Sequence, residues 1–439
     1  MITELREDAF PEIYERFVKL LDGKPWIKAT KDLQLQINQN RLSGPQIERE
    51  NREAFGLTFF DEYRMRRRWD PAWAGVQEAM NFVAQVCDMV DSGLGDRGTK
   101  AYIGRVKGAF KNSRDMRALR LEHLAAVRFF CQGASITWPD ESKGQETYDL
   151  LATGLTHTPI EVECKSTSRD KGRLITEKAF VDFLEHLLPA AKAASTPGEA
   201  LLVRVEVPNR LPTRTSALEE LASEVISAIG LGEASTPGGY RLETHRSFPM
   251  FLTHTPQAEM KHTGLYHYAL EVLGEMQGYR AIELYGNAGL VFEICSKREN
   301  DPLGKLWDTA KKAVRHQMTG TRPGCLILKL EGWSRKEFLM LTESTVNVLG
   351  VFAQELFSDE KHQHLACVVF ASEEAIQDID PFHGLAQSCI WVADRQEGAY
   401  ANLGISQILL GTANPPKRDV TQPQAAAATA GTQTPPACS

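Results

Sequence analysis

The alternation of hydrophobic and polar residues over 147–165 predicts a β-hairpin. Tyr148–Ala152 forms its first strand, Gly, Thr and Pro residues supply the turn, and Ile160–Lys165 returns. Successive side chains of a strand point to opposite faces. The return strand therefore has one apolar face (Ile160, Val162, Cys164) and one charged face (Glu161, Glu163, Lys165). Two carboxylates and an ammonium are unusual on a strand expected to be largely buried, so the hairpin is the first candidate for chemistry.

The periodicity around the hairpin predicts a mixed α/β fold. The chain order is a helix, three strands, a helix and a strand, which places the hairpin near the centre of one sheet. The expected elements are a helix within 101–132, a strand at 134–138, the two hairpin strands, a helix at 174–194, a strand at 200–207 and a helix at 216–229.

The regions on either side of this segment have different patterns. Residues 1–100 show helical spacing at 10–21 and 73–90, and between them Arg64–Trp69 is a basic cluster that fits either a phosphate-binding surface or a solvated face. The C-terminal half repeats a hairpin, helix, strand and helix, which we interpret as either a degenerate second copy or another α/β domain. Its expected elements are strands at 281–285 and 289–295, a helix at 303–318, a strand at 325–330, a helix at 338–357 and strands at 367–370 and 388–393.

These patterns divide the chain into four parts. We expect a helical N-terminal region (1–100), a domain containing the hairpin (101–235), a C-terminal α/β domain (236–411) and a Pro-, Ala-, Thr- and Gln-rich tail (412–439) that is disordered.

Composition narrows the classes of function. The net charge of −7 over 439 residues excludes a polycationic protein, so a nucleic-acid surface has to be a local patch. The eight cysteines are scattered without a CxxC pair, which favours free buried thiols over disulfides or a zinc site. No signal peptide and no apolar run of about 20 residues is evident, so we expect a soluble, cytoplasmic protein that does not bind a membrane.

A [D/E]-x-K tripeptide is weak evidence for a site by itself, because this chain contains five. Only Glu163/Lys165 ends a strand pattern whose hairpin partner carries an acid, Asp149. The other four fall in polar loops or at helix ends: Asp22/Lys24, Glu141/Lys143, Glu259/Lys261 and Asp359/Lys361.

A further acid lies on the helix that precedes the hairpin. Segment 101–132 begins with basic residues and becomes apolar from Leu119, and Glu122 sits within this apolar run. A glutamate there either faces solvent at the boundary of the helix or points into a polar pocket, and the pattern leaves both open.

With these residues in view, the sequence resembles the PD-(D/E)xK nuclease superfamily, which has the restriction-endonuclease-like fold. It looks most like the Mrr-type restriction enzymes and Holliday-junction resolvases. The resemblance covers about residues 115–230 and rests on Glu122, Asp149, Glu163 and Lys165. Pro139–Asp140 is a rival for the first acid, ranked below Asp149 because it precedes the second strand.

The resemblance implies a Mg²⁺-dependent nuclease, with Mn²⁺ able to substitute. Asp149 and Glu163 would supply the carboxylates that a hard cation prefers, and the Cys164 carbonyl a third oxygen. Lys165 would orient or deprotonate the attacking water and offset charge in the transition state. Glu122 would complete the metal shell or hold a water.

Other assignments follow with the resemblance. Arg169, Lys171, Arg173 and Lys178 come just after the hairpin and would contact substrate phosphates, while Glu161 is a weaker catalytic candidate. The expected partner is DNA, with RNA, a homodimer and a partner protein left open, and a role in defence against foreign DNA would suit the family. Two alternatives remain: the charged row protects an exposed edge strand, or an inactive nuclease-like fold binds nucleic acid or a protein.

Overall fold

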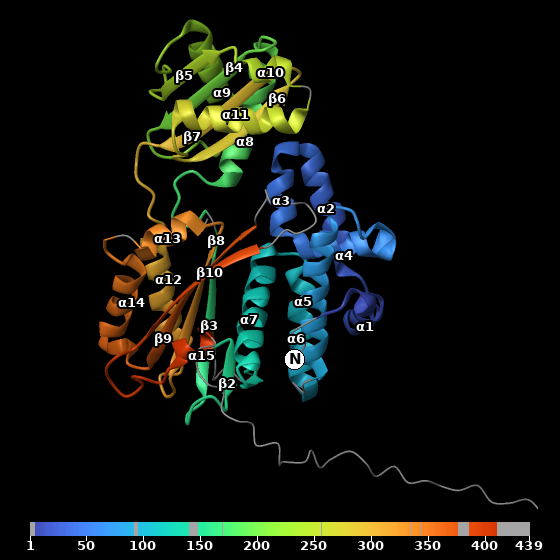
Figure 1. Ribbon diagram of the computed structural model, residues 1–439, viewed down its shortest axis with the longest axis vertical. Helices are drawn as coiled ribbons and strands as arrows, with labels where there is room; N and C mark the ends of the chain where they lie inside the picture. Colours follow the sequence, from blue (N-terminus) through green and yellow to red (C-terminus); the bar gives the residue numbers. More distant parts are fainter. Residues whose placement is uncertain are drawn as a thin grey trace, which may run out of the picture.

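The computed structural model describes residues 5–91, 95–139, 148–168, 170–255, 257–333, 335–343, 345–375 and 386–410. These residues form a mixed α/β structure with two separate sheets and a helical region (Figure 1). The predicted α/β class is therefore confirmed. The candidate residue Arg169, the rival acid Asp140 and the tail 412–439 lie outside the described residues.

The N-terminal region is helical, as predicted. Its core is built from aromatic side chains, because the apolar positions of α1 fall on one stripe that buries Phe10, Tyr14 and Phe17 against Trp26 and Phe60. The helices are α1 (Phe10–Leu21), α2 (Pro25–Gln39), α3 (Gly44–Glu50), α4 (Arg52–Tyr63), α5 (Trp73–Asp91), α6 (Gly95–Ala109) and α7 (Ser113–Cys131). The segment expected to hold one helix before the hairpin thus contains the end of α6 and all of α7.

The hairpin belongs to a six-stranded sheet with the order β1-β2-β3-β8-β9-β10. β1 to β3 form an antiparallel meander, β3, β8 and β9 are parallel, and β10 is antiparallel to β9. The strands are β1 (Ser135–Thr137), β2 (Leu150–Thr153), β3 (Ile160–Thr167), β8 (Gly324–Glu331), β9 (Leu365–Ala375) and β10 (Ala386–Asp394). β3 is therefore an interior strand, and the edge-strand alternative for its charged row is wrong.

Helices cover both faces of this sheet. α7 packs on the face that carries Val162 and Cys164 of β3. On the other face, α12 (Pro302–His316) packs against Leu326 and Leu328 of β8. Glu163 and Lys165 are the register partners of these two leucines, so their side chains lie on the α12 face. Helices α13 (Arg335–Glu343), α14 (Val348–Ser358) and α15 (Ile405–Leu410) complete this part of the molecule.

A second, four-stranded sheet lies between β3 and α12 in the chain, with the order β5-β4-β7-β6. Its parallel central pair, β4 and β7, is flanked by antiparallel edge strands. The strands are β4 (Ala200–Val207), β5 (Arg241–Ser247), β6 (Tyr279–Tyr285) and β7 (Ala288–Ser296). The helices are α8 (Glu177–Ala193), α9 (Thr215–Leu231), α10 (Met250–His254) and α11 (Ala258–Leu273). α8 and α9 cover one face, and α10 and α11 cover the other.

This insertion corrects the predicted sheet. Helix α8 and strand β4 occur where the pattern indicates, but they do not complete the hairpin sheet; α12 and β8 take that position. The division at residue 235 also falls within the second sheet, between α9 and β5. An apolar strand after an amphipathic helix carries no signal for which of two sheets it joins, because interior strands of both are buried on both faces.

The C-terminal half is corrected in two further respects. The predicted hairpin forms as β6 and β7, but it lies in the second sheet whereas α12 and β8 lie in the first, so these elements are not a second copy of the hairpin domain. The helix expected over 338–357 is two helices, and Asn347 begins the second by accepting a hydrogen bond from Gly350 N.

Two connecting segments join the inserted sheet to the rest, and they are tied to each other. Asp301 N donates to Gly172 O (2.8 Å), and Leu174 N donates to Asn300 Oδ1 (2.9 Å). Gly172 has φ +80°, and a Cβ there would lie 2.3 Å from Asp301 O, so only glycine fits this crossing. We call these paired segments, residues 170–174 and 297–301, the neck.

Two expectations from composition can be compared with the described residues. All seven described cysteines are free thiols, five of them buried, as the scattered spacing predicts. Within the described ranges, no helix is long and apolar enough to cross a membrane.

Candidate active site

Asp149 is fixed against the middle of β3 by two backbone contacts. Its N–H donates to Val162 O (3.1 Å), and its Oδ2 accepts a hydrogen bond from Cys164 N (2.7 Å). The N–H and C=O of one strand residue point to the same edge, so the Cys164 carbonyl also faces the side on which Asp149 lies. The structure thereby places the predicted first acid beside the predicted second acid and the predicted carbonyl.

Glu163 is fully buried near the middle of β3. Lys165 forms an ion pair with its Oε1, and no described residue donates a hydrogen bond to its Oε2. A buried carboxylate normally has several hydrogen-bond donors, because leaving water costs a charged group several kcal/mol (about 1–3 kcal/mol even for a neutral polar group). Glu163 is therefore held in a position that suits an additional cation.

The acids of the site raise one another's pKa. Burial and then the Asp149 carboxylate raise the pKa of Glu163 to about 8, although Lys165 opposes this. Burial and Asp149 likewise raise the pKa of Glu122 to about 7, against the effect of Arg105. Burial acts to lower the pKa of Lys165, but the charges of Glu163 and Asp149 outweigh it and the pKa is raised. The four predicted residues thus share one electrostatic environment with an excess of carboxylates.

Glu122 is buried on α7, so the solvent-facing alternative is wrong. Arg105 of the neighbouring helix α6 holds it with two parallel hydrogen bonds, NH1 to Oε2 (2.8 Å) and NH2 to Oε1 (2.5 Å). Such a bidentate pair fixes both the position and the orientation of the carboxylate. Arg105 is a site residue that the sequence did not single out, because nothing in the spacing of two helices shows which arginine meets which glutamate.

Glu161 has the same burial as Glu163 but a different role. Its carboxylate accepts hydrogen bonds from Thr319 N (2.8 Å) and Thr319 Oγ1 (2.5 Å), and Arg322 lies 3.5 Å away. These donors come from the turn between α12 and β8. Glu161 therefore fastens that turn to the start of β3, which supports its lower rank as a catalytic candidate.

The predicted phosphate contacts separate into two groups. Arg173 faces Glu337 at 3.7 Å and lies over the Tyr279 ring, and Lys178 pairs with Asp182 at 2.8 Å. Lys171 instead hydrogen-bonds to Thr309 Oγ1 on α12. Lys171 is also close enough to Lys165 for the two charges to interact.

The residues present fit a divalent cation. Mg²⁺ is held by one or two carboxylates together with waters and substrate oxygens rather than by a complete protein cage. Among the described residues no group of three or more His, Cys, Asp or Glu side chains forms such a cage. Asp149, just before β2, and Glu163, on β3, are two such carboxylates, and no described residue donates a hydrogen bond to Glu163 Oε2. They meet this smaller requirement.

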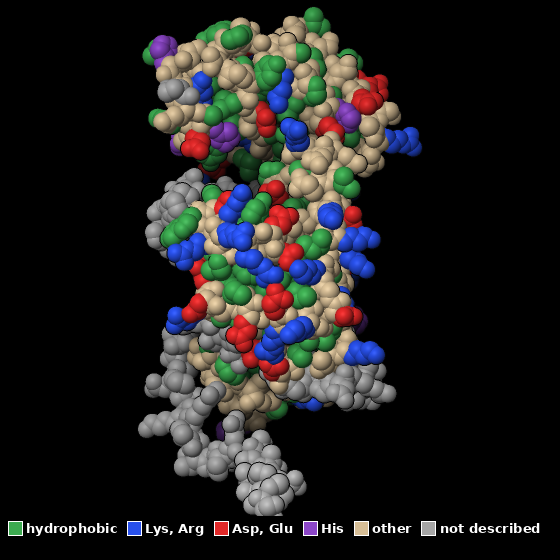
Figure 2. Space-filling model, turned by 90° about the vertical axis from the view of Figure 1, so that its right-hand side faces the viewer, with side chains coloured by type: hydrophobic (Ala, Val, Ile, Leu, Met, Phe, Trp, Pro, Cys, Tyr) green, Lys and Arg blue, Asp and Glu red, His purple; other side chains and the backbone are tan. Residues whose placement is uncertain are grey.

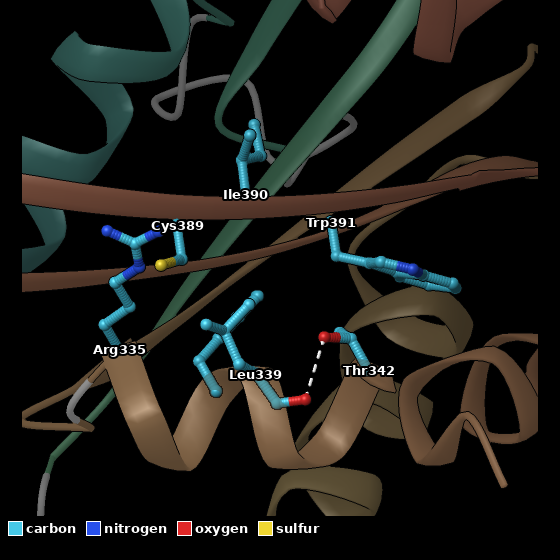
Figure 3. A pocket seen from close by; sticks show the side chains of 7 residues that line it. Arg335, Leu339, Thr342, Cys389, Ile390 and Trp391 are labelled. Atoms are coloured by element: carbon cyan, nitrogen blue, oxygen red, sulfur yellow. Dashed lines mark hydrogen bonds between the residues drawn. The ribbon is translucent and has the colours of Figure 1, made fainter. Parts of the chain in front are cut away.

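Two pockets lie away from these acids. A pocket of about 420 Å³ lies between α13 and β10, where Arg335, Leu339 and Trp391 line it (Figure 3). A second, of about 660 Å³, lies among α2, α3, the start of α7 and α8, and Lys178 is part of its lining. Neither pocket is lined by Asp149, Glu163 or Lys165, so the candidate site is argued from the arrangement of its charged side chains.

The basic cluster 64–69 belongs to a surface of mixed charge. Arg64 pairs with Glu15 at 2.9 Å, while Arg67 and Arg68 lie over the rings of Tyr63 and Trp69. On the face of the helical region seen in Figure 2, Lys and Arg side chains are interspersed with Asp and Glu. A mixed surface of this kind favours the solvated alternative over phosphate binding.

No protein-family model, curated protein or solved structure matches this chain.

Proposed function

We propose that this protein is a metal-dependent nuclease that hydrolyses phosphodiester bonds in DNA. The observation that carries the proposal is the carboxylate of Glu163, which is fully buried, lies beside Asp149 and has Lys165 as its single partner among the described residues. A structural role would supply donors to a buried acid, whereas a cation-binding role leaves its oxygens available.

The order of elements supports the same proposal. A restriction-endonuclease-like core consists of a helix, a three-strand meander, a helix and a further strand. α7, β1 to β3, α12 and β8 follow that order, with β8 parallel to β3. The inserted sheet lengthens the connection between β3 and α12 but leaves the order unchanged, so the acids occupy the strands that the resemblance implies.

The chemistry assigns a task to each residue. Asp149 and Glu163 would hold Mg²⁺, with the Cys164 carbonyl as a further oxygen. When bound, Mg²⁺ polarises a phosphate and lowers the pKa of a coordinated water. The Lys165 ammonium is held beside the carboxylates, where it orients the attacking water and offsets negative charge on the phosphate. Glu122, fixed by Arg105, holds a water or completes the shell.

Cleavage of plasmid and single-stranded DNA, with Mg²⁺ or with chelator, tests this proposal. We expect Asp149→Ala to reduce the rate about a thousandfold and Lys165→Ala about a hundredfold or more, since each removes charge at the reacting phosphate. Lys361→Ala is the matched control, because Lys361 ends another [D/E]-x-K tripeptide and is exposed. Cleavage that survives both substitutions, or no cleavage of any nucleic acid by the wild type, would contradict the proposal.

A further inference from the structure

Two lysines approach Lys165 from segments that are far apart in the sequence. Lys171 lies in the neck just after β3, and its Nζ hydrogen-bonds to Thr309 Oγ1 on α12. Lys312 is three residues beyond Thr309, so it lies on the same face of that helix. α12 packs over the face of the sheet that carries Lys165. β3, the neck and α12 therefore bring three ammonium groups to one place.

The charges of these lysines act on one another. Burial lowers the pKa of Lys171 first, and the positive charges of Lys312 and Lys165 lower it further. Asp308 acts in the opposite direction, but it faces Lys305 at 3.6 Å. Lys171 therefore remains in a predominantly positive environment despite the acid nearby.

The cluster has few anionic partners of its own. Lys165 is paired with Glu163, whereas neither Lys171 nor Lys312 forms an ion pair with any described carboxylate. Lysines held together repel one another, and an anion between them removes that repulsion. Two of the other basic residues near the neck are already engaged, Arg173 by Glu337 and Lys178 by Asp182.

We propose that Lys171 and Lys312 bind a backbone phosphate of the substrate, next to the phosphodiester that is cleaved at Asp149 and Glu163. This inference rests on the proposed nuclease function. It adds the two residues that would hold the substrate beside the bond that is cleaved. A phosphate at this position is held by charge and carries no base, so the contact positions a polynucleotide without reading its sequence. It also explains why Lys171 is anchored to α12: the Thr309 hydroxyl fixes its ammonium in place.

The test compares the double variant Lys171→Ala/Lys312→Ala with Lys311→Ala. Lys311 is adjacent to Lys312 on α12, but its ammonium lies over the Trp307 ring. Lys311→Ala therefore removes a lysine from the same helix outside the cluster and serves as the control. Binding of a fluorescent DNA duplex would be measured in chelator at several salt concentrations, and KM and kcat in Mg²⁺. Thermal unfolding of each variant shows that its fold is retained.

We expect the double variant to raise Kd and KM about tenfold while kcat changes less than twofold. The slope of log Kd against log salt should fall by about one, as for one lost phosphate contact, and Lys311→Ala should match the wild type. Wild-type Kd, KM and slope in the double variant would overturn the inference, and the nuclease proposal would stand if Asp149→Ala still abolished cleavage. A wild type that binds but does not cleave, with binding lost in the double variant, would overturn the nuclease proposal alone.

Discussion

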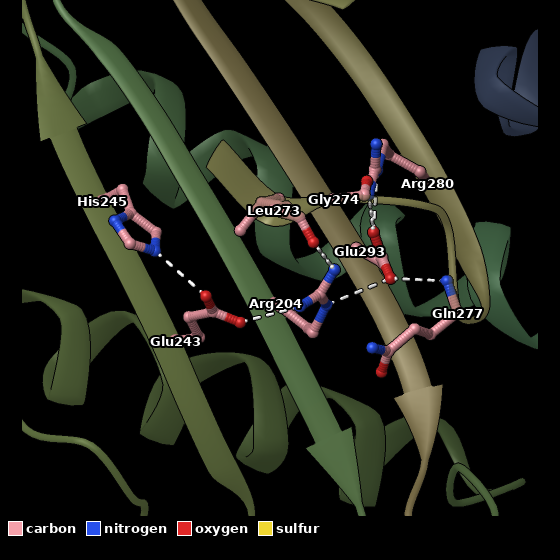
Figure 4. A network of polar contacts seen from close by, with 8 residues as sticks. All are labelled: Arg204, Glu243, His245, Leu273, Gly274, Gln277, Arg280 and Glu293. Carbon is pink, nitrogen blue, oxygen red and sulfur yellow. Dashed lines mark hydrogen bonds and ion pairs between the residues drawn. The ribbon is translucent and has the colours of Figure 1, made fainter. Parts of the chain in front are cut away.

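Each of the two sheets buries a glutamate in a central strand, and the surroundings of the two acids differ. Glu293 on β7 accepts hydrogen bonds from Arg204 Nε (3.1 Å), Arg280 Nε (2.7 Å) and Gln277 N (2.9 Å) (Figure 4). Glu163 on β3 is equally buried, but Lys165 is its single partner among the described residues and the contact is an ion pair. One carboxylate is thus saturated with donors and the other is not.

This difference separates a structural acid from a candidate ligand. The guanidinium groups around Glu293 also bond to the backbone, Arg204 to Leu273 O and Arg280 to Gly274 O, so the network holds the strands of the second sheet to the end of α11. Around Glu163 the charge of Lys165 is opposed by the carboxylates of Asp149 and Glu122, which together with burial raise its pKa. Burial alone therefore does not indicate function; the shortage of donors does.

The sharpest test of the comparison replaces each glutamate by glutamine. Glu293→Gln should lower the free energy of unfolding by about 3–5 kcal/mol, because it leaves Arg204 and Arg280 without their buried counter-ion. Glu163→Gln should change it by less than about 1 kcal/mol, because Glu163 is protonated below about pH 8 in the metal-free protein and the amide replaces a neutral group of the same shape. The same variant should abolish cleavage, because it removes a carboxylate that would hold the metal. Urea unfolding in chelator, followed by tryptophan fluorescence, measures the free energy of unfolding of the two variants. Equal losses in the two variants would erase the distinction between the two acids.

The pH dependence of stability tests the raised pKa of Glu163. In the folded, metal-free protein the Glu163 carboxyl keeps its proton up to about pH 8. In the unfolded chain the same carboxyl has its ordinary pKa of 4.5 and loses the proton near that pH. Between these values the folded state binds more protons, so the free energy of unfolding falls as pH rises, by up to about 1.4 kcal/mol per pH unit. Unfolding of wild type and Glu163→Gln from pH 5 to 8 should show a shallower fall in the variant. Parallel curves for the wild type and the variant would contradict the raised pKa, because they would mean that Glu163 is ionised in the folded protein from pH 5 to 8.

The smallest effect on cleavage is expected at Glu161, on the same face of β3 as Glu163. Glu161→Gln keeps a carbonyl oxygen for Thr319 and loses only the charge that faces Arg322, so we expect about 1 kcal/mol of destabilisation. Its kcat should stay within about threefold of the wild type, since Glu161 is saturated like Glu293. A loss of cleavage as large as that of Asp149→Ala would move Glu161 into the site.

The local pattern of hydrophobic and polar residues was enough to predict many individual helices and strands. It was not enough to predict which strands pair with one another in a sheet. The bounds expected for α1 and β4 match the structure, because strict periodicity and flanking turn residues define them. The sheet to which β4 belongs depends on β7, which lies much later in the chain. A long insertion between β3 and α12 leaves no mark in the alternation of residues, so the sequence favours the nearer helix and strand.

The site was predicted in the same uneven way. Glu163 and Lys165 lie on β3 and Asp149 directly precedes its hairpin partner β2, so local spacing is enough to place the three together. Glu161 could not be told from Glu163 on the same face, because its donor Thr319 is 158 residues away in the sequence. The burial of Glu122 likewise depends on Arg105, which reaches it from a different helix.

The neck has a consequence for the order in which the chain folds. Thr167 and Lys329, which meet across β3 and β8, are 162 residues apart, and closing so long a loop is costly in chain entropy. Once the inserted sheet has formed, the bond between Asp301 and Gly172 brings the two ends of the insertion together and shortens the effective loop. We therefore expect the insertion to fold first and to act as a bridge for the later strand pairing. The acids of β3 would reach their final surroundings only at the end of folding.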